Sequence, residues 1–157
     1  MKKHPGTYAL ILTPNSSKPV LIGKLGMLQV RPGYYIYVGS AFGPGGLKAR
    51  IAHHRKISNR PRWHIDYLRT VTHLRELWYS YDPRPREHQW ANIIAGTREI
   101  VAPLPGFGSS DCNCKSHLYF LKSKPKIESF RRRLRATIED HEKVLIEKIE
   151  KQPQSTI

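Results

Sequence analysis

A strand-like segment followed by a basic helical segment carries side chains that suit an anionic group such as a phosphate. The segment YYIYVGS at 34–40 contains three tyrosines, and LKARIAHHRKI at 47–57 contains Arg50 and His54. Arginine is always charged and can hold a phosphate with two donors. If 47–57 is a helix, Arg50 and His54 are four residues apart and share one face. The pattern therefore predicts a phosphate-binding site where a strand meets a helix.

Glycines connect these two segments. Gly39, Gly45 and Gly46 allow a tight passage from strand to helix and a close approach of the backbone to a phosphate. We expect Ser40 to donate to the same group, and His53 to be a solvated helix residue rather than a catalyst. The residues that we predict to contact nucleic acid are Gly39, Ser40, Lys48, His53, Arg55 and Lys56.

The charge of the chain points to a polyanionic partner. There are 27 lysine and arginine residues against 12 aspartate and glutamate residues, for a net charge of +15. Residues 126–151 hold 8 basic and 6 acidic side chains, so the remaining 19 basic and 6 acidic ones lie before them. The excess therefore belongs to the folded body, which favours nucleic acid over an anionic membrane surface or a role in solubility alone.

Length and composition predict a soluble, cytoplasmic protein. A chain of 157 residues suits one compact domain with one appended element. No segment approaches the roughly 18 apolar residues of a membrane span. The first residues lead directly into strand-like sequence, so we expect no cleavable signal.

The pattern of apolar residues, glycines and prolines predicts an α+β fold. We expect an antiparallel or mixed sheet flanked by helices, with one or two further strands at 18–33. The strands are predicted at 6–14, 34–40, 73–81 and 117–122, the helices at 47–57, 62–70 and 87–96, and a long loop at 103–116.

The end of the chain predicts a long amphipathic helix. Its apolar residues recur at helical spacing: Ile127, Phe130, Leu134, Ile138, Leu145 and Ile149. We therefore divide the chain into a main domain, 1–122, and a C-terminal helix with its tail, 123–157. This helix packs on the body, or it meets a protein partner or a second copy of the chain.

The ordered motifs resemble the GIY-YIG nuclease superfamily. GTY at 6–8 and YVG at 37–39 correspond to its two naming motifs, with Thr7 in place of the usual isoleucine. Arg50 and His54 have the spacing of the superfamily's arginine and its histidine or tyrosine. Glu87 opens the later helix, where the superfamily places a metal-binding glutamate.

More specifically, the chain resembles the Uri-type branch over about residues 6–122. The segments that carry this resemblance are GYYIYVGSA, GGL, WHIDYL and GFGSSDCNCKSHL. The 28 residues between GTY and YVG form a longer gap than the superfamily usually has, and we interpret them as an inserted hairpin. The superfamily's late asparagine has no clear match, and we do not assign its role to Asn92.

The resemblance implies a DNA endonuclease that uses one Mg²⁺ or Mn²⁺ ion. Taken alone, Tyr8 and Tyr37 are typical of core tyrosines and Glu87 of a residue that starts a helix. The ordered motifs favour catalytic roles for Tyr8, Tyr37, Arg50 and His54, and a metal-binding role for Glu87. A phenol has an ordinary pKa near 10, so we expect Arg50, neighbouring cations and the metal to lower it.

Other polar residues are expected to support the site. His64 and Asp66 are two apart on a helix and do not share a face. Asp66 is expected to orient His54 or to add a second acid to the metal site, and Asp111 to join the site from the long loop. Cys112, Cys114 and His117 are one ligand short of a closed zinc site, so buried thiols in a turn are the favoured interpretation.

The sequence leaves other functions open. The principal alternative is a non-catalytic nucleic-acid-binding module on the same scaffold, and another is a subunit that recruits a partner through its C-terminal helix. The kind of DNA is not specified, and RNA is not excluded as the substrate. The small size and the absence of a sequence-reading module suggest a role in DNA repair or processing.

Overall fold

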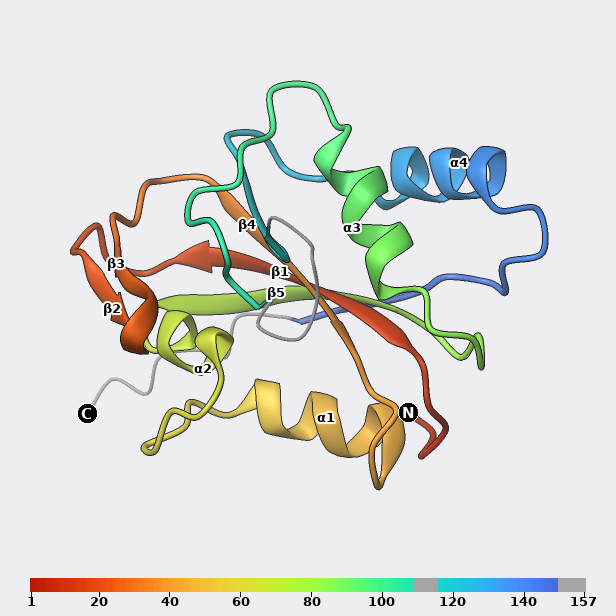
Figure 1. The fold of residues 1–157 in the computed structure, drawn as a ribbon, viewed down its shortest axis with the longest axis horizontal. Coiled ribbons are helices and arrows are strands. Elements are labelled where there is room, and N and C mark those ends of the chain that lie inside the picture. The colour runs from red at the N-terminus through yellow and green to blue at the C-terminus, as the bar shows by residue number, and fades with distance from the viewer. Residues whose placement is uncertain (109–115, 150–157) are drawn as a thin grey trace.

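The computed structural model describes residues 1–108 and 116–149 and has the predicted α+β class. In this part of the chain an antiparallel sheet has the strand order β6-β4-β1-β5-β7 (Figure 1). Its strands are β1 (Thr7–Pro14), β4 (Tyr34–Ser40), β5 (Thr72–Ser80), β6 (Leu118–Leu121) and β7 (Leu145–Lys148). The helices are α1 (Gly46–Arg55), α2 (His64–Arg69), α3 (Glu87–Ala95) and α4 (Ile127–Thr137).

The central strand β1 is buried on both faces of the sheet. Leu10 and Leu12 face one apolar core, whereas Ala9 and Ile11 face the other, and all four are fully buried. Helices α1 and α2 cover the first face, and α3 and α4 cover the second (Figure 1). A strand enclosed in this way reads as a continuous apolar run, as ALIL does here.

The register of β1 and β4 places the two motif tyrosines on one face of the sheet. Tyr8 lies opposite Gly39, and Leu10 lies opposite Tyr37. Tyr37 and Gly39 are two residues apart and therefore point to the same side of β4. Tyr8 and Tyr37 are thus diagonal neighbours across the strand pair.

The inserted hairpin that the sequence predicts is present. It consists of β2 (Val20–Ile22), a 3-10 turn at Gly23–Leu25 and β3 (Gly26–Leu28). Ile22 and Leu28 are buried against the core that also contains Leu68 of α2. The insertion therefore extends the first core beside α2 (Figure 1).

The prediction of one long C-terminal helix is wrong. Helix α4 ends at Thr137, and the chain then becomes extended and adds β7 to β5, with Ile146 opposite Trp78. The turn between them is held by polar contacts: Trp90 Nε1 donates to His141 Nε2 at 2.9 Å, and Arg84 pairs with Asp140. The helical spacing of Leu145 and Ile149 could not reveal that this segment pairs with β5, because β5 lies far away in the sequence.

The apolar side of α4 is covered by the protein's own body. Phe130 is buried and stacks on Trp78 with a centroid distance of 5.4 Å, and it meets Trp90 edge to face at 5.0 Å. Leu134 is buried in the same core. This face therefore packs on the body, which was one of the two predicted possibilities.

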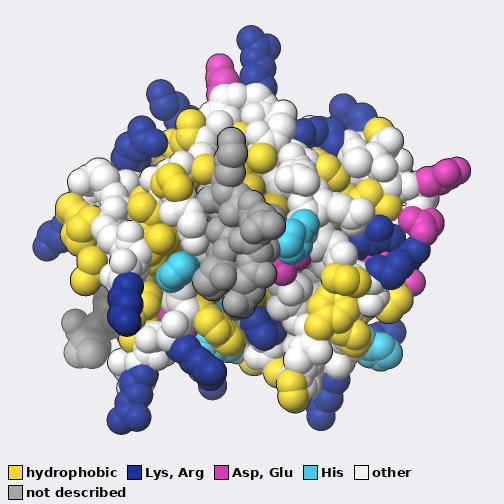
Figure 2. Space-filling view, in the orientation of Figure 1, with side chains coloured by type: hydrophobic (Ala, Val, Ile, Leu, Met, Phe, Trp, Pro, Cys, Tyr) yellow, Lys and Arg dark blue, Asp and Glu magenta, His cyan; other side chains and the backbone are white. Residues whose placement is uncertain are grey.

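Basic side chains are spread over the visible face of the molecule and far outnumber acidic ones there (Figure 2). Within residues 1–108 and 116–149, no helix combines the length and the apolar character that crossing a bilayer requires.

Candidate functional site

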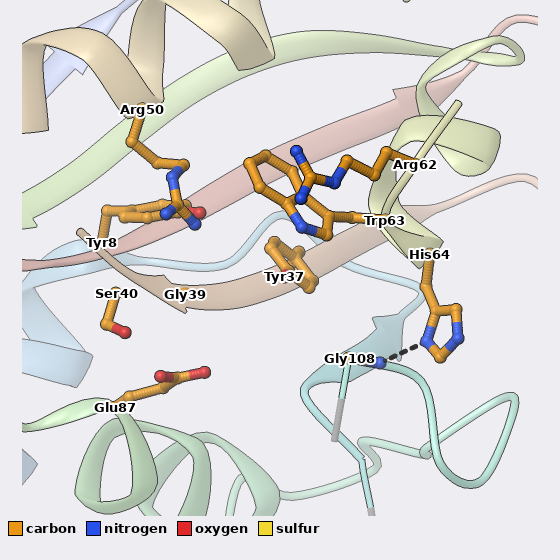
Figure 3. A pocket seen from close by; sticks show the side chains of 10 residues that line it. All are labelled: Tyr8, Tyr37, Gly39, Ser40, Arg50, Arg62, Trp63, His64, Glu87 and Gly108. Carbon is orange, nitrogen blue, oxygen red and sulfur yellow. Dashed lines mark hydrogen bonds between the residues drawn. The ribbon is translucent and has the colours of Figure 1, made fainter. Parts of the chain in front are cut away.

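A polar pocket of about 250 Å³ opens where β1, β4, α1 and the start of α3 meet. In Figure 3 the Tyr8 phenol and the Arg50 guanidinium face the same space as Ser40 and the Glu87 carboxylate. A phosphate group with several water molecules fits a space of this size. The residues that line it are Tyr8, Tyr37, Gly39, Ser40, Arg50, Arg62, Trp63, His64, Glu87 and Gly108.

The phenols of Tyr8 and Tyr37 lie side by side in this pocket, with ring centroids 6.5 Å apart. Gly39 makes room for one of them, since a Cβ atom on Gly39 would come within 2.4 Å of the Tyr8 hydroxyl oxygen. The glycine of the YVG motif is therefore required by the side chain on the neighbouring strand. Gly39 also lines the pocket, so the predicted close approach of a phosphate there stays a prediction.

His54 supports the pocket from behind Tyr8 rather than lining it. Its Nε2 atom lies 2.7 Å from the Tyr8 hydroxyl, and the side chain is buried. Burial, followed by the charges of His53 and Arg50, lowers the pKa of His54 to about 3. The imidazole is therefore neutral at neutral pH, and it sets the direction of the Tyr8 hydroxyl.

In the protein without bound ligands, Arg50 acts to lower the pKa of the Tyr8 phenol as expected, but burial outweighs it, and the contribution expected from the metal stays a prediction. Burial raises the pKa of Tyr8 well above its ordinary value, and the charge of Tyr37 adds to this. Arg50 acts in the opposite direction through its charge and a hydrogen bond, but it does not outweigh burial. Burial likewise raises the pKa of Tyr37, and both phenols are protonated at neutral pH.

Arg50 reaches the pocket from α1, and its guanidinium lies over the Trp63 ring, 4.5 Å from the centroid. Stacking on an indole holds the guanidinium in place. Its N–H donors lie in the plane of the guanidinium and point away from its edge, so stacking does not block them. The side chain is half-buried, so these donors remain accessible from the pocket. Arg50 is thus a preformed binding group for an anion.

Glu87 enters the pocket from the first turn of α3, as the resemblance implies. Its Oε1 atom lies 2.6 Å from Nδ1 of His117, and its side chain is 20% exposed. Burial by itself would raise the pKa of Glu87, but hydrogen bonding by His117 and Ser40 outweighs burial and lowers it. Glu87 is therefore an ionised carboxylate that faces the pocket.

Only some of the residues predicted to contact nucleic acid line the pocket. Gly39 and Ser40 line the pocket, whereas Lys48 and Lys56 are exposed near the two ends of α1. Arg55 binds both carboxylate oxygens of Glu147 on β7, at 2.7 and 2.8 Å. Arg55 therefore links α1 to the edge of the sheet.

The start of α1 is closed to a phosphate. Gly46 has a φ of +58°, and a Cβ atom there would come within 2.3 Å of the Lys3 carbonyl oxygen. The amides of Leu47 and Lys48 already donate to the carbonyls of His4 and Lys2. The glycines thus fit the N-terminal segment against the helix instead of exposing amides to a ligand.

The supporting residues also differ from expectation. Asp66 bonds His53 Nε2 at 2.8 Å, so it orients His53 rather than His54. His64 lines the pocket and its Nδ1 atom accepts a hydrogen bond of 2.8 Å from the amide of Gly108 (Figure 3). Asp111, Cys112 and Cys114 lie outside the described residues.

Sequence reasoning missed some residues of the site. Trp63 was not among the predicted site residues, but it is half-buried and lines the pocket beside Arg62. His117 was considered only with the cysteines, whereas it holds Glu87. The WHIDYL segment gave a signal for Trp63, but no local pattern connects His117 with a glutamate 30 residues earlier.

A family model matches residues 7–140, a range that contains every residue lining the pocket. Its description is Domain of unknown function DUF123, which states no activity. Comparison with curated proteins and with solved structures found no match.

Proposed function

The chain belongs to this family of unknown function, and from the side chains that meet in its pocket we propose that the protein is a divalent-metal-dependent endonuclease of GIY-YIG type that hydrolyses DNA phosphodiester bonds. One observation carries the proposal. Tyr8, Tyr37, Arg50 and Glu87 come from four different elements and line a single pocket. These are residues that the resemblance to the superfamily, and to its Uri-type branch, singles out.

Arg50 is the group that binds the scissile phosphate. Its charge is permanent, the guanidinium is stacked on Trp63, and a guanidinium can bind phosphate oxygens with two parallel donors. The net charge of +15 brings the polyanionic backbone to the surface in the first place. A phosphodiester therefore suits the pocket better than an uncharged substrate does.

Tyr8 and Tyr37 are the groups that donate hydrogen bonds and transfer protons. Both are protonated in the free protein. Tyr37 can donate its hydroxyl hydrogen to an incoming phosphate or to the attacking water, whereas the Tyr8 hydroxyl shares a 2.7 Å hydrogen bond with His54 Nε2. For Tyr8 to act as general base, its own proton must leave first. The charge of Arg50, which opposes burial in setting the Tyr8 pKa, favours that state.

Glu87 is the ligand for the divalent cation. Metal ligands must be deprotonated, and the lowered pKa of Glu87 meets this requirement. Mg²⁺ and Mn²⁺ bind through one or two carboxylates, with water and phosphate oxygens completing the shell, so a single glutamate in a polar pocket fits either ion. Such an ion, when bound, neutralises charge on the phosphate and activates water. His117 holds the carboxylate in orientation.

Cleavage of labelled oligonucleotides tests the proposal. The panel contains single-stranded, duplex and branched DNA and an RNA of the same sequence, each incubated with Mg²⁺, Mn²⁺ or a chelator. We expect metal-dependent cleavage of at least one DNA. The role that we propose for this activity is DNA repair or processing in the cytoplasm. Cleavage of the RNA but of no DNA would show that the substrate is RNA and that the proposed DNA specificity is wrong.

Paired variants connect cleavage to the pocket. Glu87→Gln and Arg50→Ala should abolish cleavage, while Glu139→Gln and Arg135→Ala remove the same charges from exposed positions on or just after α4 and should not. Salt-sensitive binding without cleavage of any substrate would overturn the proposal in favour of a non-catalytic binding module.

A further inference from the structure

Three potential metal ligands gather in a cluster whose residues are not among those that line the pocket. They are His53 and His54 of α1 and Asp66 of α2. One donor atom of each residue lies within 4.8 Å of the donor atoms of the other two. His54 and Asp66 are buried, whereas the His53 side chain is 37% exposed.

One ring nitrogen of His54 forms a hydrogen bond, and the other has no hydrogen-bond partner among the described residues. Its Nε2 atom is held by the Tyr8 hydroxyl at 2.7 Å. Its Nδ1 atom is buried, and among residues 1–108 and 116–149 it has no hydrogen-bond partner. An unpaired polar atom in the interior destabilises the folded state, so such an atom points to a missing partner.

Asp66 is held in a manner typical of a metal-binding carboxylate. Its Oδ2 atom accepts hydrogen bonds of 2.9 Å from the backbone amides of Arg62 and Trp63. Its Oδ1 atom faces His53 Nε2 at 2.8 Å. One oxygen thus fixes the side chain to the backbone, while the other remains on the side of the histidines.

We propose that His53, His54 and Asp66 form a binding site for a transition-metal ion such as Zn²⁺, separate from the hard-metal site at Glu87. Two imidazoles and one carboxylate are the donor set that Zn²⁺ and its first-row neighbours prefer, whereas Mg²⁺ prefers oxygen donors alone. Nδ1 is the His54 atom that binds the ion. The exposed edge of His53 supplies the path of entry.

Occupation of this site has a consequence for the pocket. With a metal on Nδ1, the neutral ring of His54 carries its hydrogen on Nε2. Nε2 then donates to the Tyr8 oxygen, and the Tyr8 hydroxyl hydrogen is directed elsewhere. The site would thus fix the orientation of a pocket residue without contacting the substrate.

Metal titration without nucleic acid tests the proposal independently of any nuclease activity. The parent is the full chain with Cys112→Ser and Cys114→Ser, because these thiols would compete for Zn²⁺. After treatment with a chelator, this protein should bind one equivalent of Zn²⁺ by calorimetry. With Co²⁺ it should show the visible absorption of a site with nitrogen and oxygen ligands.

Single substitutions identify the ligands. His53→Ala changes a partly exposed side chain and should weaken Zn²⁺ binding at least about tenfold. Asp66→Asn keeps a carbonyl oxygen for the amides of α2 and should do the same. His4→Ala, at an exposed histidine, and Glu87→Gln should leave the Zn²⁺ affinity unchanged.

Two patterns of Zn²⁺ affinity among these variants would refute the proposed metal site. Equal Zn²⁺ affinity in the parent and in both His53→Ala and Asp66→Asn would show that these residues form only a structural hydrogen bond. Loss of Zn²⁺ binding in Glu87→Gln alone would assign the ion to the pocket instead.

Discussion

The hydroxyl of Tyr8 lies 2.7 Å from Nε2 of His54, in a buried hydrogen bond that joins the central strand to α1. The two residues are 46 positions apart in the chain. Their contact ties the arginine-bearing helix to the sheet at the point where the pocket opens. The hydrogen bond therefore serves both the stability of the fold and the orientation of a pocket residue.

Removal of the Tyr8 hydroxyl should affect stability and activity together. Tyr8→Phe leaves His54 Nε2 buried without a partner, so we expect a loss of about 1–3 kcal/mol in the free energy of unfolding. On the proposed function, cleavage should also fall below detection. Denaturant unfolding and the cleavage assay measure the two effects. Tyr34→Phe, on the same sheet but outside the pocket, should change either by little.

An alanine at Gly39 should displace the Tyr8 ring. A Cβ atom there would come within 2.4 Å of the Tyr8 hydroxyl oxygen, and we expect Gly39→Ala to cost about 1–3 kcal/mol of stability and to suppress cleavage. Gly43→Ala is the matched control, since no atom lies within 4 Å of its added Cβ. Thermal unfolding compares the two, and equal melting temperatures would contradict the steric role of Gly39.

The contact between His117 and Glu87 should determine how much Mg²⁺ or Mn²⁺ is needed for cleavage. His117→Ala removes the partner 2.6 Å from Oε1, so the Mg²⁺ or Mn²⁺ concentration for half-maximal cleavage should rise at least about tenfold. His117→Asn keeps an N–H donor and should recover part of the loss. Titration of cleavage against metal measures both variants, and an unchanged midpoint in His117→Ala would remove His117 from the metal site.

Acid should destabilise the protein partly through Asp82. Its carboxylate is fully buried and bonds the side chains of Arg84 and Arg86, with His141 at 4.0 Å and Asp140 on the far side of the arginines. Burial alone would raise the pKa of Asp82, but hydrogen bonds from Arg84 and its neighbours lower it from 3.8 to about 2. The folded state therefore favours the ionised form.

The sign of the pH effect follows from this lowered pKa. A carboxylate with a lower pKa in the folded state stabilises the protein above its ordinary value of 3.8, and this contribution disappears as the pH falls through about 2. The difference corresponds to about 2 kcal/mol. Asp82→Asn should thus be less stable than the wild type at neutral pH, and denaturant unfolding should show the gap closing near pH 2. A gap independent of pH would contradict this role.

Local sequence was sufficient for the elements that carry the motifs. Strands at 6–14 and 34–40 and a helix at 47–57 were predicted within two residues of their observed bounds. Each is bounded by glycine, proline or serine, and its residues agree in propensity. The hairpin in the insertion was predictable for the same reason.

The C-terminal segment shows where local reasoning ends. Leu145 and Ile149 fit a helical period, yet residues 145–148 are a strand because the edge of β5 offers unpaired backbone groups beside an apolar face. A spacing of four residues does not reveal which neighbour a segment will find. The pairing depends on a strand that lies about 70 residues earlier.

By itself, the sequence determined the types of side chain in the pocket, the elements that carry them and the positive charge around them. Only the tertiary structure decided the partners: Tyr8 with His54, Glu87 with His117, and His53 with Asp66. These pairs depend on strand register and helix docking, where a slip of one residue turns a side chain to the opposite face. Register and docking are set by burial across both cores at once, and no local spacing contains that information.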